Sequence, residues 1–593
     1  MFPRRAIWWA ASIVACLSSI ASAAADDQEL AQQGYALLKK YCHRCHGVDR
    51  NGNAALDMDR RESLLLVADG KKQSYITPGK PEESFAWERM AITKDMPPKD
   101  EPQPSADELK ILEAWITAGA PFPGRPKRPY VTIEKVLSAI DKHLDSVPVD
   151  ERKYQRFYTF THLYNNNEKV TDDALRLYRA ALSKVANSLS WESTIVVPKA
   201  IDAEQTVFAI DLRDYGWDKD KIWSAILQPY PYGLKYDQQK GEVGRLATNI
   251  YQKSGSDLPF IRADWFINTA TRPGAAEKAD DPGLYHKVLQ LPMTAEALEK
   301  LLRVDVIANF RRDRLARAGF AQSGISGQNR LVERHSSAYG AYWKSYDFRP
   351  GQDQGNLFKR PLGPKFTGNE FENVSFVHDG GEVIFNLPNG LQGYLLLDGK
   401  GNRINAGPID VVSDRLKSSG TAFIVNGLSC IVCHKNGMNP FKDTVRSGAG
   451  VFGDAKRKVE KLYPDAPIMA KFVDEDTQQF LKALELATGE FLQVGAEKDK
   501  PIESFEEPVG DVVGRYLADL GAEELAFELG VVDPAELKVA VRVNTQLRAL
   551  GLGPIVEGGT IKREEWESLS HTISTFQKTA SELELGVPFR QFR

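Results

Sequence analysis

GLSCIVCHKNG, residues 427–437, carries a Cys-x-x-Cys-His motif far along a chain of 593 residues. The same motif occurs earlier, in YCHRCHGVD, residues 41–49. The residues that flank the two copies differ completely, so the sequence shows no internal repeat around them. This difference predicts that the two motifs lie in two different domains.

The first 25 residues predict export from the cytoplasm. MFPRR is a short basic segment, AIWWAASIVACLSSI is an apolar run of 15 residues, and ASAAA offers cleavage after Ala23 or Ala25. The apolar run is shorter than the ~20 residues that a membrane-spanning helix needs. IVAC, ending at Cys16, resembles a lipoprotein box, which would anchor the mature chain to a membrane through a lipid. We expect a periplasmic or cell-envelope location, with lipid anchoring at Cys16 as an open alternative.

Cysteine usage after the leader is confined to the two motifs. The four remaining cysteines are Cys42, Cys45, Cys430 and Cys433. In an exported chain they could form two disulfides, and Cys-x-x-Cys is also typical of redox and zinc sites. A histidine directly after the second cysteine, found both times, favours the attachment signature of c-type haem. The sequence therefore predicts two covalently attached haem c groups, with His46 and His434 as proximal iron ligands.

Length and composition indicate a folded chain of several domains. At ~100–200 residues per domain, 593 residues suggest three or four domains. The hydrophobic share of 42% and the charged share of 26% are ordinary for folded soluble protein. The formal net charge is −4, and nothing in it indicates a nucleic-acid partner.

Segment 26–123 predicts an all-α domain around the first motif. DQELAQQGYALLKKY has helical apolar spacing, and SADELKILEAWITAGAP begins with a capping box of Ser105 and Glu108. Between these helices, ITKDMPPKD holds Met96 in a loop that prolines stiffen. We expect Met96 to bind the first iron opposite His46, with Met90 as the competing candidate.

The same segment resembles the planctomycete-type cytochrome c domain, a relative of class I cytochromes. YCHRCHG, TPGKPEES, DMPPK and LKILEAWITAGAP follow one another in the order that this family uses. The resemblance implies His46 and Met96 as axial ligands and Pro78 in the wall of the haem pocket. It also implies that the first and last helices cross near Gly34 and Trp115.

The remainder of the chain predicts an α+β region and a helical end. GRPKRPYV begins a mixed region over 124–369, and strand-and-turn sequence such as EVIFNLPNGLQGYLLLDGKGN follows over 370–440 with the second motif. Residues 441–593 are helix-rich. The order YGAYWKSYDF, GGEVIFNLPNGLQGYLL and NGLSCIVCH also resembles uncharacterised dihaem proteins. That resemblance implies an architecture and names no substrate.

The sixth ligand of the second iron has several candidates. Met438 follows His434 too closely to reach the opposite face of the iron easily. The remaining candidates are Met469, His335, His378 and His571. We favour His335, because the aromatic run YGAYWKSYDF beside it could wall a porphyrin and Arg334 could pair with a haem propionate.

Two classes of function fit these motifs, and a third is less favoured. In the first, haem 1 transfers electrons to or from haem 2, which acts as an oxidoreductase centre on a small molecule or peroxide. In the second, both irons are six-coordinate and the chain only carries electrons to a redox partner protein. A haem-based sensor is the third. The chain contains neither G-x-S-x-G nor H-E-x-x-H, and no catalytic residue is assigned.

Overall fold

The computed structural model describes most of the chain after the leader. The described residues are 28–42, 58, 61–68, 71–99, 101–122, 127–274, 283–321, 323–351, 355–414, 417–570 and 572–590. They form two compact units, residues 1–127 and residues 128–593. Both helices and sheets are present, so the prediction of a multidomain chain that contains both is confirmed.

The first unit is built on two helices that touch at a glycine. Its described helical elements are the helix over 28–41, α3 (Arg61–Leu64), the 3-10 helix η1 (Pro81–Glu83), α4 (Phe85–Trp87), a short π-helix η2 (Glu88–Ile92) and α5 (Ala106–Thr117). The predicted capping box is present, since Ser105 and Glu108 exchange hydrogen bonds at the start of α5. A Cβ atom on Gly34 would lie 2.3 Å from the indole of Trp115. Only glycine therefore allows the first helix to approach α5 this closely.

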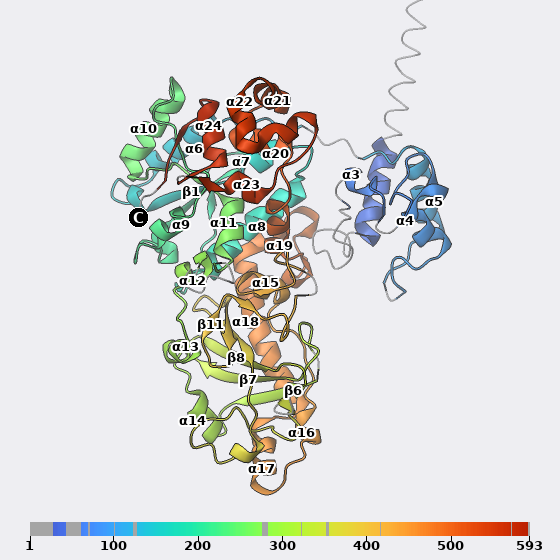
Figure 1. Ribbon diagram of the computed structural model, residues 1–593, viewed down its shortest axis with the longest axis vertical. Helices are drawn as coiled ribbons and strands as arrows, with labels where there is room; N and C mark the ends of the chain where they lie inside the picture. Colours follow the sequence, from blue (N-terminus) through green and yellow to red (C-terminus); the bar gives the residue numbers. More distant parts are fainter. Residues whose placement is uncertain are drawn as a thin grey trace, which may run out of the picture. The chain divides into compact units, whose positions relative to one another are not determined.

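The second unit contains a small sheet surrounded by helices, in the upper part of Figure 1. Its strand order is β2-β3-β1-β5, with β1 antiparallel to β3 and parallel to β5. These strands are β1 (Gln155–Thr159), β2 (Lys199–Ala200), β3 (Val207–Asp211) and β5 (Ile261–Arg262). The sequence alternates poorly here, because β1 and β3 are buried along nearly their whole length.

A six-stranded antiparallel sheet forms the lower part of the same unit (Figure 1). Its order, β11-β10-β9-β8-β7-β6, follows the chain, so each strand pairs with the next one. The strands are β6 (Ala316–Phe320), β7 (Arg330–Ser337), β8 (Gly340–Asp347), β9 (Gly380–Asn386), β10 (Gln392–Asp398) and β11 (Arg403–Ile404). Alternation along β7 directs Arg330 and Val332 to one face of the sheet and Glu333 and His335 to the other.

Shorter elements and the remaining helices complete the second unit. The strands are β4 (Leu234–Lys235), β12 (Ala406–Gly407), β13 (Ile424–Val425), β14 (Leu569–Ser570), β15 (Ile573–Ser574) and β16 (Val587–Pro588). The helices before the second motif are α6 (Ile133–Ser146), α7 (Thr161–Asn165), α8 (Asp172–Ser188), α9 (Ile222–Leu227), α10 (Glu242–Ser254), α11 (Ala263–Ala270), α12 (Gly283–Val288), α13 (Ala295–Leu301) and α14 (Val306–Arg311). Those from the motif onward are α15 (Leu428–Cys433), α16 (Val445–Gly448), α17 (Gly453–Leu462), α18 (Ala466–Leu492), α19 (Pro508–Tyr516), α20 (Ala522–Leu529), α21 (Pro534–Val543), α22 (Thr545–Leu547), α23 (Arg563–Glu567) and α24 (Thr575–Glu582).

The long helix α18 joins the two sheets into one unit. Asp476 on α18 accepts two hydrogen bonds from Arg334 on β7, each 2.7 Å long, and one of 2.7 Å from the indole of Trp343 on β8. Farther along, α18 packs on α8 beside the small sheet. One continuous hydrophobic core includes Tyr158 of the small sheet and Phe385 of the large one. The three segments expected after residue 123 thus fold around a shared core.

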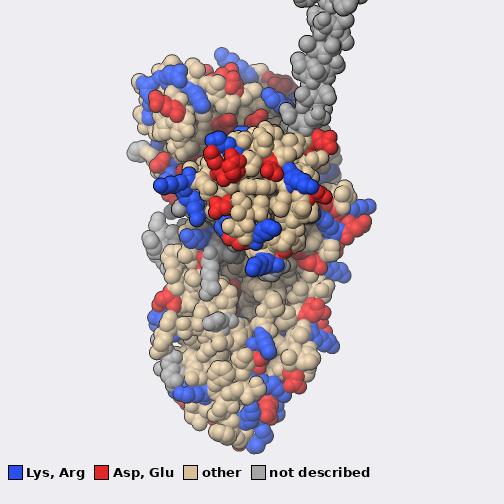
Figure 2. All heavy atoms as spheres, turned by 90° about the vertical axis from the view of Figure 1, so that its right-hand side faces the viewer, with Lys and Arg blue, Asp and Glu red and all other residues tan. Residues whose placement is uncertain are grey.

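The surface carries charge of both signs. Figure 2 shows Lys and Arg side chains interspersed with Asp and Glu side chains over the face that it presents. Among the described helices, none combines the length and the hydropathy that crossing a bilayer requires.

Candidate functional site

The second motif lies on a short helix that begins at a strained glycine. Gly427, just before α15, has a φ of 83°. A Cβ atom there would lie 2.7 Å from the carbonyl oxygen of Thr271, so both conformation and space require glycine. The helix then ends at His434. In this way one helical turn presents Cys430, Cys433 and His434 together.

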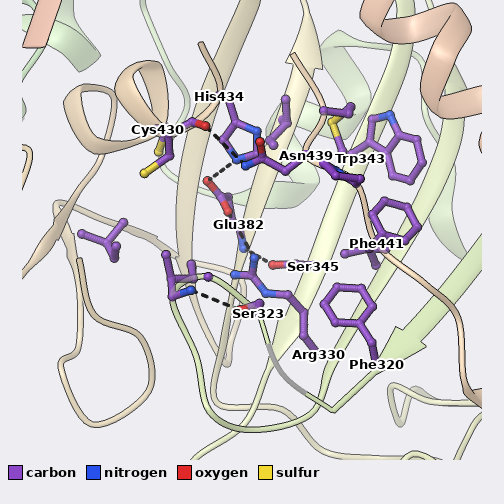
Figure 3. A pocket seen from close by; sticks show the side chains of 18 of the residues that line it. Phe320, Ser323, Arg330, Trp343, Ser345, Glu382, Cys430, His434, Asn439 and Phe441 are labelled. Carbon is purple, nitrogen blue, oxygen red and sulfur yellow. Dashed lines mark hydrogen bonds and ion pairs between the residues drawn. The ribbon is translucent and has the colours of Figure 1, made fainter. Parts of the chain in front are cut away.

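These three side chains line a cavity of about 630 Å³ (Figure 3). The large sheet supplies one wall, and the loop after the motif supplies much of the rest. The wall residues from the sheet include Arg330, Val332, Trp343, Ser345, Glu382 and Ile384. A cavity of this size lies within the ~300–1,000 Å³ typical of sites for cofactors and other small molecules.

Aromatic rings form one side of the cavity. Phe441 stacks on Phe320 with ring centroids 5.6 Å apart, and it meets Trp343 edge-on at 5.9 Å. The indole of Trp343 is fixed by its hydrogen bond to Asp476. A rigid apolar surface of this kind suits a large, flat and hydrophobic ligand.

His434 is oriented for metal binding by its own loop. Its Nδ1 lies 3.0 Å from the carbonyl oxygen of Gly437. Because a carbonyl only accepts, Nδ1 carries the proton and donates it, which leaves the lone pair on Nε2. Histidines that bind metals use this arrangement, in which a backbone carbonyl fixes the tautomer. Nε2 lies on the side of Glu382, whose Oε1 is 3.9 Å away.

The two thiols are held in a neutral state. Cys430 and Cys433 are both free of disulfides. Burial raises the pKa of Cys433 to about 12 and the pKa of Cys430 well above its ordinary value. Without a bound cation, these surroundings favour the neutral thiol over the thiolate. Within the described parts of the chain, no group of three or more His, Cys, Asp or Glu side chains is placed to hold a metal ion.

His335 does not reach this cavity. It is fully buried on the opposite face of the sheet, where its Nδ1 lies 3.1 Å from the amide nitrogen of Asn309 and its Nε2 lies 3.2 Å from Glu333. Arg334 shares the face of the cavity, but its guanidinium is bound to Asp476 instead. The interpretation of His335 as an iron ligand in this cavity is therefore corrected, because strand alternation directs it to the other side.

The other candidates for the sixth ligand are placed differently from one another. Met469 is buried in the core on α18, and His378 packs edge-on against Tyr346 with ring centroids 4.9 Å apart. Neither is among the residues that line the cavity. Met438, in contrast, does line it. His571 lies outside the described residues.

Two residues that the sequence interpretation missed, Glu382 and Arg330, stand inside the cavity (Figure 3). Arg330 donates to both carboxylate oxygens of Asp347, at 2.6 and 3.0 Å. It also approaches Glu382, with Nη1 3.6 Å from Oε2. The available signal was a charged residue at a position of the β-prone run GGEVIFNL that faces the same side as Ile384.

The first motif is described only in part. Cys42 follows directly on the first helix and is half-buried, whereas Cys45 and His46 lie outside the described residues. Met90 is buried in the core of the first unit. Met96 is half-buried in a loop that an ion pair between Arg89 and Asp95 fixes at 2.6 Å.

Pro78, assigned to the wall of the first haem pocket by the resemblance, is exposed in this structure. Burial of Met90 in the core leaves Met96 as the more accessible of the two methionines that compete for the first iron. The geometry around that iron's proximal histidine is not among the described parts of the chain.

Comparison with known proteins identifies the first unit. Residues 42–100 match the family model of planctomycete cytochrome C. The resemblance inferred from the sequence is thereby confirmed for this segment, which is a c-type cytochrome domain. A domain of this type implies covalently bound haem c. No curated protein and no solved structure matches the chain. The family match ends long before the second motif.

Proposed function

We propose that the chain is an exported dihaem c-type cytochrome. Haem 1, in the planctomycete-type domain, is an electron-transfer module coupled to haem 2, which is an oxidoreductase centre in the second unit. The observation that carries this proposal is the joint placement of Cys430, Cys433 and His434 on one cavity, with Nε2 of the histidine directed into it.

The residues present fit a covalently attached haem at the second motif. Cys430 and Cys433 would form the thioether links, and a neutral sulfur suits the buried Cys430 and the half-buried Cys433 better than a thiolate does. His434 would hold the iron through Nε2, and the rings of Phe441 and Trp343 would flank the macrocycle. When bound, the haem supplies a redox-active iron whose behaviour depends on its axial ligands and on the polarity of its pocket.

The polar side chains of the cavity favour chemistry over simple electron carriage. A pure carrier needs a firm sixth ligand, and His434 is the only histidine among the cavity residues that the structure describes. Glu382 and Arg330 give the same cavity two charged groups, which a site that only transfers electrons does not require. One observation favours the carrier alternative, because Met438 in the wall offers a thioether.

The proposed partners follow from the two units. A redox partner protein would exchange electrons with the cytochrome domain, and a small molecule would react in the cavity of the second unit. We place the chain in the periplasm or at the cell envelope on the basis of its leader, with lipid anchoring at Cys16 as a further proposal.

Cyanide binding to the oxidised holoprotein tests the assignment. We expect cyanide to perturb the absorption spectrum of one haem and to leave the other unchanged. The variant with Cys430→Ala and Cys433→Ala should lose this response. If neither iron binds cyanide, the result would instead support the carrier. Met438→Ala should then make the second haem responsive to cyanide.

A further inference from the structure

A buried aromatic ring packs against the imidazole of His434. Tyr394, on β10, has its ring centroid 6.0 Å from that of the imidazole, and the two ring planes are inclined by 30°. Tyr394 is 2% exposed and is not among the residues that line the cavity, whereas His434 is (Figure 3). The imidazole therefore has this ring on one side and the cavity on another.

Tyr394 is itself held at three points. Its backbone N–H donates to the hydroxyl of Tyr285 on α12 at 3.0 Å, and that hydroxyl donates to the backbone carbonyl of Tyr394 at 3.3 Å. The hydroxyl of Tyr394 donates to Oε1 of Gln392 at 3.1 Å. Because both the backbone and the tip of the side chain are bonded, the ring of Tyr394 is fixed against His434.

The same two tyrosines touch the motif helix at both of its ends. A Cβ atom on Gly427, where α15 begins, would lie 2.8 Å from the ring of Tyr285. At the other end, Tyr394 meets His434. Burial raises the pKa of both phenols well above the ordinary value, so the pair adds no charge to the surroundings of the motif.

Tyr394 complements the hydrogen bond that His434 makes within its own loop. The bond from Nδ1 to the carbonyl oxygen of Gly437, 3.0 Å long, lies in the plane of the imidazole and fixes its tautomer. A ring packed against the imidazole opposes its rotation. Since the side chain of His434 is 12% exposed, the ring also keeps water from part of its surface. Together the two contacts define one orientation of the imidazole.

We propose that Tyr394 is a positioning residue of the second haem, which fixes the plane of the His434 imidazole and thereby strengthens its bond to the iron. Groups that orient a ligating histidine typically contribute about 10–100-fold to metal affinity or activity. Tyr285 acts one step behind, because it holds the backbone of Tyr394. This inference rests on the proposed function, because it requires a haem on His434.

Resonance Raman spectroscopy of the reduced holoprotein tests this role, because the iron–histidine stretching band reports the bond itself. The band is seen when the iron is five-coordinate, as the oxidoreductase proposal requires of the second haem. We expect Tyr394→Leu to move the band to lower frequency and to broaden it, because the imidazole then samples several orientations. Tyr394→Phe keeps the ring and loses the bond to Gln392, so its band should stay as in wild type.

Matched variants separate positioning from general packing. Tyr342, on β8, is fully buried and packs edge-on against His335 on the face of the sheet away from the cavity. We expect Tyr342→Leu to lower stability and to leave the band unchanged. If Tyr394→Leu does not take up the second haem, Tyr285→Phe serves instead, since it removes both bonds to the backbone of Tyr394 and keeps its own ring. It should move the band in the same direction by a smaller amount.

The outcomes separate this inference from the proposed function. A wild-type band that Tyr394→Leu and Tyr285→Phe leave unchanged, or that Tyr342→Leu shifts equally, would overturn the inference alone. A loaded wild-type protein without the band would overturn the oxidoreductase proposal. The width of the electron paramagnetic resonance signal of the oxidised second haem would then test the inference, which predicts a broader signal for Tyr394→Leu than for Tyr394→Phe and is wrong if the widths are equal.

Discussion

The two Cys-x-x-Cys-His motifs share a pentapeptide and little else. The first follows a helix in a small unit whose residues 42–100 match a known cytochrome family. The same unit holds Met96, the predicted ligand of the first iron, in a proline-rich loop. The second lies on one helical turn between an antiparallel sheet and a loop, in a unit outside the residues that the family model matches. The comparison teaches that the motif indicates attachment of a haem, whereas the walls around it decide what the haem does.

The largest expected effect comes from removing one attachment site at a time. We expect Cys430→Ala with Cys433→Ala to leave one haem per chain, and Cys42→Ala with Cys45→Ala to leave the other. Haem staining of denaturing gels and the intact mass measure this. If either double variant retained two haems, the one-motif, one-haem correspondence would be wrong.

Replacing the two methionines should sharpen the contrast between the irons. Axial ligands set haem potentials over about 0.8 V, and a thioether raises the potential, so we expect Met96→Ala to lower one potential by roughly 0.1–0.3 V. If the sixth position of the second iron is open to outside ligands, Met438 does not bind that iron firmly. Met438→Ala should then leave both potentials nearly unchanged. A redox titration followed by absorbance reports both. A large fall caused by Met438→Ala would favour the carrier.

Two glycines allow a comparison of structural strain in the two units. Gly427→Ala imposes a strained φ and a contact with Thr271, and we expect a loss of about 1–3 kcal/mol in the free energy of unfolding, with lower occupancy of the second haem. Gly34→Ala forces Trp115 to move, at a similar cost of about 1–3 kcal/mol confined to the first unit. Thermal unfolding followed at haem and far-ultraviolet wavelengths distinguishes them. Equal effects of both variants on the second haem would contradict this separation.

The smallest effect on the haems is expected from His335→Ala. The variant removes the contacts with Asn309 and Glu333 on the far face of the sheet, which should cost about 1–3 kcal/mol of stability. The spectrum of each haem should stay as in wild type. A change in the spectrum of the second haem would support His335 as its ligand after all.

The sequence predicted those features that depend on local pattern. Helical spacing and capping located α5, and four motifs in family order located the cytochrome domain. The cysteine count and the histidine after each pair indicated the attachment sites, which in the second unit the structure brings to one cavity.

Features that depend on strand register were beyond reach of the sequence. The aromatic run beside His335 was expected to wall the haem, but its residues alternate between the two faces of the sheet. Among its large rings, only Trp343 lines the cavity. Glu382 comes to lie near His434 because β9 pairs with β8 and so carries it into the wall of the cavity. Met438 reaches the cavity because the chain turns at Gly437, with a φ of 91°, directly after the histidine.

Peptide mapping of the purified holoprotein tests the central claim, that the second motif holds a haem. Cleavage after Lys417 and Lys435 releases residues 418–435, which contain both cysteines and His434. We predict that this peptide carries one covalently bound haem, seen in its mass and in its absorption at the Soret wavelength. Recovery of the same peptide with free thiols or a Cys430–Cys433 disulfide, from a protein whose first motif is loaded, would contradict the account.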